Sequence, residues 1–248
     1  MGRLIGIETD TGNKRTLNED AVGYYEDSNI SIFIVADGMG GHNAGEVASR
    51  IAKDTVLEYI INHYSDGSME HILEASINEA NKAVHKYSLL NDNCSGMGTT
   101  LTVAVVKNNK LFIANVGDSG CYITVGGKLK KVTKDHSLVQ ELLDNGTITK
   151  EEALNHPIKN VITRAIGTKV TVKSDIYILD LEGISKVILC SDGLTNEVNE
   201  DEMLNIICSD DSNICLSLVE LSKEKGGRDN ISVIIFKGEC ADDWNRIG

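Results

Sequence analysis

Apolar residues recur along the chain with the spacing of three and four positions that is typical of amphipathic helices. The two longest such stretches are residues 44–64 and 68–90, so the sequence predicts two long helices in succession. Capping-box spacing, a polar residue followed three positions later by Glu, predicts shorter helices after Thr149 and Asn199. A last helix is predicted from about residue 212 to the glycine pair at 226–227.

Shorter apolar runs predict β-strands, several of them joined by two-residue turns. The predicted strands are residues 30–36, 99–106, 110–116, 121–125, 128–132, 187–190 and 231–236. Asn108-Asn109 and Gly126-Gly127 separate consecutive runs as hairpin turns do, which predicts antiparallel pairing. Two long helices in succession do not fit a regular strand–helix alternation. We therefore predict an α+β fold, a central antiparallel β-sandwich flanked on both faces by helices in α-β-β-α layers.

Length and composition limit the number of domains and the kinds of partner that are expected. The 248 residues hold no repeat, low-complexity tract or proline-rich linker, so one domain spanning residues 1–248 is predicted. The formal net charge of −13 argues against a nucleic-acid partner, because a basic footprint is absent. It does not exclude a phosphorylated substrate, since bound cations reverse the local field. Without a targeting segment or an 18-residue apolar run, no membrane partner is expected.

The cysteines indicate the compartment. Six are present, at positions 94, 121, 190, 208, 215 and 240, without a Cys-x-x-Cys pair or the His spacing of a zinc site. Several stand inside apolar runs, as buried thiols do. We therefore expect reduced thiols and a cytoplasmic protein.

Five acidic motifs stand at or beside the ends of predicted strands. They are Asn18-Glu19-Asp20, Asp37-Gly38-Met39-Gly40-Gly41, Gly117-Asp118-Ser119, Ser191-Asp192-Gly193 and Arg228-Asp229-Asn230. Strand ends on one edge of a sheet lie close together, so these carboxylates are expected to converge. Two charges about 4 Å apart repel by roughly 4 kcal/mol at an effective dielectric of about 20, so such a cluster requires divalent cations. Oxygen ligands select magnesium, manganese or calcium, which predicts a multinuclear hard-metal site.

Each motif alone also has an ordinary structural explanation. Asp37 with its glycines is either a metal site, in which the Gly38 carbonyl approaches an ion, or a tight strand-to-helix turn with Asp as a cap. The other motifs have ordinary explanations of the same kind. The motif around Asp118 could be a hairpin corner, that around Asp192 a common turn, and that around Asp229 a helix-to-strand loop. Nucleotide binding is a weak alternative, since Gly-x-Gly-Gly lacks the Rossmann and P-loop spacing. It is the five acidic turns together that require counter-charge.

The motifs, taken in order, resemble those of the metal-dependent protein phosphatases of type 2C. The residues that carry the resemblance are Arg15-Thr16-Leu17-Asn18-Glu19-Asp20, Val35-Ala36-Asp37-Gly38-Met39-Gly40-Gly41-His42, Gly98-Thr99-Thr100, Ala114-Asn115-Val116-Gly117-Asp118-Ser119, Ser191-Asp192-Gly193-Leu194 and Gly227-Arg228-Asp229-Asn230. Residues 135–139 and 162–167 look like the bacterial branch, which opposes Hanks-type Ser/Thr kinases. The match covers nearly the whole chain.

The resemblance implies a set of metal ligands, with Mn²⁺ or Mg²⁺ as the cofactor. Asp37 would bridge two core ions with help from the Gly38 carbonyl, and Asp192 and Asp229 would complete the shell of the first ion. Asp118, together with Asp192, would form a third, weaker site.

The resemblance also implies roles at the edge of the cluster. Glu19 and Asp20 would hold waters on the second ion. Arg15 would bind the substrate phosphate as a bidentate fork, the alternative being an ordinary surface charge in a loop.

The implied reaction is hydrolysis of phosphoserine and phosphothreonine in proteins. Two cations about 3.5–4 Å apart produce a bridging hydroxide near neutral pH. The hydroxide attacks phosphorus in line, while the cations and Arg15 neutralise charge on the phosphoryl oxygens. The expected partners are phosphorylated proteins and a Hanks-type Ser/Thr kinase whose action the enzyme reverses, and a monomer is expected.

Two departures from the family pattern concern the proton donor and the third site. Many relatives have His where this chain has Met39, and Met cannot protonate a leaving alkoxide. His42 and a metal-bound water are the two candidates, although His42 is equally a polar cap on the helix that follows. Gly120 stands where many relatives have Arg, which bears on the substrate or the third ion.

The sequence allows two roles for one segment and two alternative functions for the protein. Residues 134–163, with His136, His156 and the only proline, Pro157, resemble the family's flap beside the catalytic cleft. This segment is either a mobile flap that selects protein substrates or a rigid insert. The rival functions are a pseudophosphatase, which retention of Asp37, Asp192 and Asp229 disfavours, and a regulator specific for an anti-sigma-factor antagonist, which usually carries a sensor domain.

Overall fold

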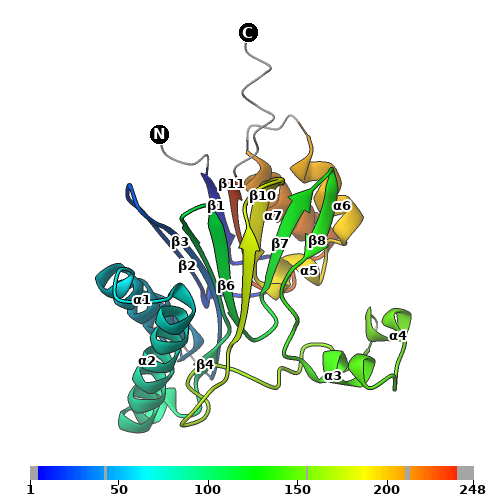
Figure 1. Cartoon of the computed structure of the whole chain (residues 1–248). Coiled ribbons are helices and arrows are strands. Elements are labelled where there is room, and N and C mark those ends of the chain that lie inside the picture. Colours follow the sequence, from blue (N-terminus) through cyan, green and yellow to red (C-terminus); the bar gives the residue numbers. More distant parts are fainter. Residues whose placement is uncertain (1–4, 42–43, 155, 210–212, 239–248) are drawn as a thin grey trace.

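Two antiparallel β-sheets lie face to face with helices outside each of them (Figure 1). The computed structural model describes residues 5–41, 44–154, 156–209 and 213–238. This arrangement confirms the predicted α+β sandwich with α-β-β-α layers. No helix in these described ranges is both long enough and apolar enough to span a bilayer.

The first sheet contains both ends of the described chain. Its strands, in spatial order, are β1 (Ile5–Asp10), β11 (Ile231–Lys237), β10 (Ile184–Cys190), β7 (Gly120–Val125) and β8 (Lys128–Lys131). Gly126 and Gly127 connect β7 to β8 with φ of 56° and 73°. These positive values are those of the predicted two-residue hairpin turn.

The second sheet is built mainly from the first half of the chain. Its strands, in spatial order, are β2 (Asp20–Glu26), β3 (Ser31–Met39), β5 (Leu101–Lys107), β6 (Lys110–Val116) and β9 (Asp175–Asp180), and the short β4 (Gly98–Thr99) pairs with the end of β3. Asn108 and Asn109 connect β5 to β6 with φ of 50° and 58°, again a hairpin turn as predicted.

The helices divide between the two outer faces (Figure 1). On the second sheet lie α1 (Ala44–His63) and α2 (Met69–Leu90), followed by the 3₁₀ turn η1 (Asp92–Cys94), and on the first lie α5 (Asp192–Thr195), α6 (Glu200–Ile207) and α7 (Ile214–Lys225). The predicted capping box at Asn199 is present, with Asn199 and Glu202 exchanging hydrogen bonds. Both α3 (Leu138–Asp144) and α4 (Lys150–Leu154) extend away from the sandwich.

The central strands are mostly apolar because both of their faces are buried. On β3, Ile32 and Ile34 pack towards α1 and α2, whereas Phe33 and Val35 point between the sheets. Phe33 stacks on Phe236 of β11, with ring centroids 3.7 Å apart and planes 7° from parallel. This contact joins the two sheets directly.

Four strands of the described ranges were not predicted as such: the edge strands β1, β2 and β9, and the short β4, which the predicted run 99–106 did not separate from β5. Both β1 and β9 alternate between half-buried and exposed residues, and β2 is mostly half-buried, so none of them is buried along most of its length as the central strands are. The apolar run at 30–36 predicted a strand that ends before Asp37, and this boundary was wrong. β3 continues to Met39, because β4 pairs with its last residues.

The cysteines agree with the expectation of reduced thiols wherever they are described. Cys94, Cys121, Cys190, Cys208 and Cys215 are free. The sixth, at position 240, lies outside the described residues.

The Phe33–Phe236 contact predicts a large stability loss when one ring is removed. Phe236→Ala should lower the free energy of unfolding by about 3–5 kcal/mol, since it leaves a cavity between the sheets. Urea denaturation measures this. Leu216→Ala on α7, where the side chain is 41% exposed, is the control and should cost less than about 1 kcal/mol. Equal losses in the two variants would contradict the inter-sheet core.

Candidate active site

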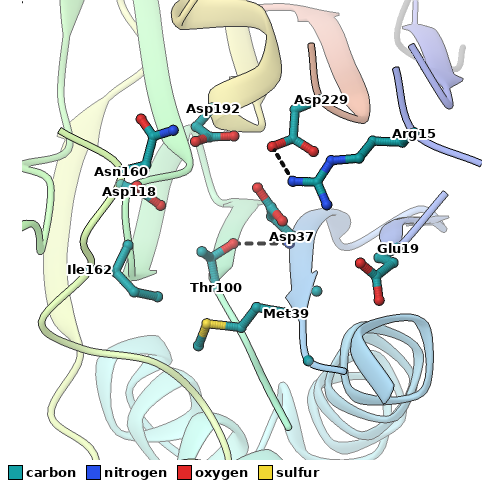
Figure 2. A pocket seen from close by; sticks show the side chains of 12 residues that line it. Arg15, Glu19, Asp37, Met39, Thr100, Asp118, Asn160, Ile162, Asp192 and Asp229 are labelled. Carbon is teal, nitrogen blue, oxygen red and sulfur yellow. Dashed lines mark hydrogen bonds and ion pairs between the residues drawn. The ribbon is translucent and has the colours of Figure 1, made fainter. Parts of the chain in front are cut away.

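A cavity of about 320 Å³ opens between the ends of the two sheets. Its lining comprises Arg15, Glu19, Asp37, Gly38, Met39, Gly40, Thr100, Asp118, Asn160, Ile162, Asp192 and Asp229. Figure 2 shows Asp37 in the middle of this group, with Asp192 and Asp229 above it and Arg15 beside Asp229. The structure therefore brings together residues from five separate acidic motifs.

Sheet pairing fixes the position of Asp37. Asp37 stands directly opposite Asp20 in the register of β2 and β3. Its backbone N–H donates to Thr100 Oγ1 at 2.9 Å, and its carbonyl accepts from the Thr100 N–H at 2.8 Å. Asp37 is thus held inside a strand and is not the cap of a strand-to-helix turn.

The other carboxylates come from both sheets. Asp192 follows β10 at the start of α5, and Asp229 stands just before β11, both in the first sheet. Asp118 lies where the chain crosses from β6 in one sheet to β7 in the other, so it is not a hairpin corner. The expectation that the carboxylates share one edge of one sheet was wrong, because the cluster forms where the ends of two stacked sheets meet.

Burial and mutual repulsion change the protonation of this cluster. The pKa of Asp37 is raised well above its usual value, first by desolvation and then by the neighbouring charges of Asp20 and Asp192. Desolvation likewise raises the pKa of Asp20 to about 7 and that of Asp118 to about 8. Burial also raises the pKa of Asp192, and the neighbouring charge of Asp229 raises it further.

Several carboxylate oxygens in the site have no protein partner. Glu19 Oε1, Asp20 Oδ1 and Asp192 Oδ1 are buried and accept no hydrogen bond from the described residues. Buried oxygens of this kind are normally satisfied, so a cation is the natural partner here. The all-oxygen donor set fits Mg²⁺ or Mn²⁺. Among the described residues, however, no three acidic, His or Cys side chains are already arranged as a cage for an ion.

Asp20 and Glu19 hold different places around the cavity. Asp20 Oδ2 accepts hydrogen bonds from Ser191 Oγ at 2.8 Å and Ser232 Oγ at 2.7 Å, so Asp20 ties the second sheet to the first. Glu19 lines the cavity, and burial is the main cause that raises its pKa. Both residues therefore lie beside the cluster of carboxylates.

Arg15 contributes the positive charge at the rim of the cavity. Its Nη2 donates to Asp229 Oδ2 at 2.9 Å, and its side chain is 49% exposed (Figure 2). An ion pair this exposed adds only about 0–1 kcal/mol, so an anionic ligand can replace Asp229 as the partner of the guanidinium.

Asn230 is a functional residue that the sequence argument did not single out. Its Oδ1 accepts from the Glu19 N–H at 2.8 Å, and its Nδ2 donates to the Thr11 and Leu17 carbonyls at 2.9 Å each. This buried amide holds both ends of the loop that carries Arg15. Its position directly after Asp229 in an acidic motif was the available signal.

Further residues missed by the sequence argument support or line the site. Asn196 donates to Asp192 Oδ2 at 2.9 Å, one turn after it in sequence. The hydroxyls of Thr100 and Ser119 are 2.7 Å apart and connect the Asp37 strand to the Asp118 turn. Asn160 and Ile162 bring residues 134–163 to the cavity wall, and no local pattern identifies them.

Two of the remaining predicted residues line the cavity, and the third is not described by the structure. Gly38 lines the cavity, and an added Cβ would lie 2.1 Å from the Gly45 carbonyl oxygen, so only glycine fits there. Met39 also lines the cavity. His42, one of the two candidates for the proton donor, lies outside the described residues.

Comparisons with known proteins identify the family of this chain. The model of the protein phosphatase 2C family matches residues 11–211. The serine/threonine phosphatase stp of Listeria welshimeri is 42% identical over 237 residues, covering 93% of this chain and 94% of that protein. The solved structure of Stp1 from Staphylococcus aureus has a TM-score of 0.89 at 33% identity and covers 96% of both chains.

A further solved structure is described with its metals. The catalytic domain of the phosphatase PstP, in complex with two manganese ions, has a TM-score of 0.82 at 32% identity and covers 95% of this chain and 97% of that one. The chain therefore belongs to the protein phosphatase 2C family, in its bacterial branch, and it is an enzyme, a protein phosphatase.

The raised carboxyl pKa values predict that the metal-free protein is less stable at higher pH. Asp20 and Asp118 keep protons in the folded state up to about pH 7 and 8, whereas the unfolded chain releases them near 3.8. Their contribution to stability is complete below that value and is lost as the pH rises through 7 and 8. In EDTA, the free energy of unfolding should fall by at least about 2 kcal/mol between pH 5 and pH 8.

Excess Mn²⁺ provides the control for this measurement. Ions bind the deprotonated carboxylates, so their presence should abolish or reverse the fall. Equal stability at both pH values in EDTA would show that these carboxyls are not buried against one another.

Proposed function

We propose that the protein removes phosphate from phosphoserine and phosphothreonine in other proteins, using Mn²⁺ or Mg²⁺, and opposes a bacterial Ser/Thr kinase. The observation that carries this proposal is the convergence of Asp37 and Asp192, from two different sheets, on a cavity that also holds Arg15. The stp phosphatase of Listeria and the manganese-bound PstP domain support it by their names and ligands.

The acidic residues of the cavity would bind the metal ions. Asp37, with the Gly38 carbonyl, would bridge two ions, and Asp192 and Asp229 would complete the first of them. Asp118, with Asp192, would hold a third ion more weakly. When bound, the two core cations supply positive charge and a hydroxide formed from water near neutral pH.

Glu19, Asp20 and Arg15 would act around that core. Glu19 Oε1 and Asp20 Oδ1, which have no hydrogen-bond partner among the described residues, would orient waters beside the second ion. Arg15 would leave Asp229 and bind the phosphate through two parallel N–H···O bonds, stabilising charge on the phosphoryl oxygens. Because the nucleophile comes from water, no Ser, Cys or His side chain needs to be phosphorylated.

The proton for the leaving alkoxide has two candidate sources. Met39 lines the cavity but carries no acidic hydrogen. The donor is therefore His42 or a water held in the site.

The wider setting belongs to the same proposal. We treat residues 1–248 as one catalytic domain in which residues 134–163 form a flap, because Asn160 and Ile162 from this segment line the cavity. The free cysteines of the described residues are typical of a reducing compartment, which supports a cytoplasmic location. We propose a monomer whose partners are phosphorylated proteins and a Hanks-type kinase.

Hydrolysis of p-nitrophenyl phosphate should require Mn²⁺ or Mg²⁺ and stop in EDTA. Asp192→Asn should lower kcat/KM by at least about a hundredfold. Losing a residue that merely supports a metal ligand already costs up to about a hundredfold in activity, and losing a ligand itself should cost no less. Its metal-free fold should be as stable as wild type or more so, because one buried repulsion disappears. Asp180→Asn, with a side chain 76% exposed on β9, is the control. Turnover in EDTA, or a near-native rate of Asp192→Asn, would refute the assignment.

Arg15→Ala should raise KM for a phosphothreonine peptide by about 10–100-fold, the effect of losing a hydrogen bond to a charged group. Arg15→Lys should recover only part of the loss, because an ammonium cannot form the two parallel bonds. Arg50→Ala, on the exposed surface of α1, controls for net charge. Initial rates over a range of peptide concentrations give both constants, and an unchanged KM for Arg15→Ala would remove Arg15 from substrate binding.

A further inference from the structure

His136 is a buried histidine that the proposed reaction does not use. It is 5% exposed and begins the segment that carries Asn160 and Ile162 to the cavity. A buried histidine needs partners for both ring nitrogens, so these partners indicate what it does.

One side of His136 is bonded twice to the turn that presents Asp118. The His136 backbone N–H donates to the Gly117 carbonyl at 2.9 Å, and the Gly117 N–H donates to His136 Nδ1 at 3.1 Å. Gly117 has a φ of 107°, and an added Cβ would lie 2.6 Å from the Thr100 side chain. Gly117, the residue before Asp118, is therefore held by His136 on one side and packs against Thr100 on the other.

The second ring nitrogen faces a carboxylate. His136 Nε2 lies 3.3 Å from Asp175 Oδ2 and 3.1 Å from Arg164 Nη1. Arg164 Nη1 donates to the other oxygen, Asp175 Oδ1, at 2.8 Å, so the carboxylate is the acceptor between the two side chains. Because Nδ1 accepts the Gly117 hydrogen, the ring proton stands on Nε2 and is donated to Asp175. Burial lowers the pKa of His136, which keeps Nδ1 free to accept.

The other backbone bonds of His136 lead to the flap. The Thr163 N–H donates to the His136 carbonyl at 2.7 Å, and Ser137 forms an antiparallel bridge with Ile162. Figure 2 shows Ile162 and Asn160 on the same side of the cavity as Asp118. His136 is thus bonded both to the Asp118 turn and to the returning strand of the flap.

We propose that His136 is a positioning residue: its Nδ1 holds the Gly117 N–H and thereby fixes Asp118 relative to Asn160 and Ile162 on the flap. The distance between Asp118 and the flap residues Asn160 and Ile162 is then constant when a phosphopeptide enters the cavity. The inference rests on the proposed function for the meaning of that spacing, but the bond itself exists independently of turnover.

Two substitutions separate the two ring nitrogens. His136→Asn places an amide oxygen near the position of Nδ1 and removes the Nε2 donor, whereas His136→Gln places its amide near Nε2 and removes the acceptor for Gly117. His136→Gln should raise KM for a phosphothreonine peptide about tenfold, as expected for losing a buried hydrogen bond. His136→Asn should stay within about twofold of wild type. Both variants lose one ring contact, so similar thermal midpoints are expected.

The amide resonance of Gly117 gives a readout that does not depend on activity. In metal-free protein, its ¹H shift should move upfield in His136→Gln and stay close to the wild-type position in His136→Asn. KM and this shift changing equally in both variants would show that His136 is merely structural and would overturn the proposal.

The tautomer of His136 in the wild-type protein decides the matter even where a variant fails to fold. Long-range ¹H–¹⁵N correlation should show a proton on Nε2 and none on Nδ1, and a proton on Nδ1 would overturn the proposal. Failure of the proposed function would appear separately, as wild-type protein without metal-dependent turnover, and would leave the tautomer and the Gly117 shift to judge the role of His136.

Discussion

Repulsion between buried carboxylates is the constraint on which the rest of this structure depends. Asp20, Asp37, Asp118 and Asp192 gather where two sheets meet, and burial raises the pKa of each one. Such a cluster is unfavourable on its own, so the surrounding fold must hold it in place. The stacked sheets do this through a core that includes the Phe33–Phe236 contact, well away from the charges.

Neutral polar groups then place the charged ones without adding charge. Asn230 holds the Arg15 loop, Ser191 and Ser232 hold Asp20, and the Thr100–Ser119 pair connects Asp37 to the Asp118 turn. Hydroxyls and amides satisfy the backbone and some carboxylate oxygens, but other carboxylate oxygens find no partner in the part of the chain that the structure describes. These unpaired oxygens are what makes the cavity suited to cations, whereas the adjacent Arg15 suits it to a phosphate.

The sequence predicted the central strands, the long helices and the acidic set because each has a local cause. The run at 30–36 is almost wholly apolar because β3 is buried on both faces, and the acidic residues stand in short motifs at or beside strand ends. The edge strands β1, β2 and β9 have a weaker pattern, since solvent reaches part of each of them. Asn230, His136 and Asn160 could not be assigned roles, because their partners are distant in sequence and only the folded chain brings them together.

The central claim is that these acids surround a pair of neighbouring divalent ions. Anomalous scattering from a crystal soaked in Mn²⁺ tests it most directly, because each ion gives its own peak. Two adjacent peaks are expected within the cavity, one between Asp37 and Asp192 and the other within reach of Asp37 and the Gly38 carbonyl. Peaks confined to the outer surface, with Asp37 and Asp192 contacting no ion, would contradict it.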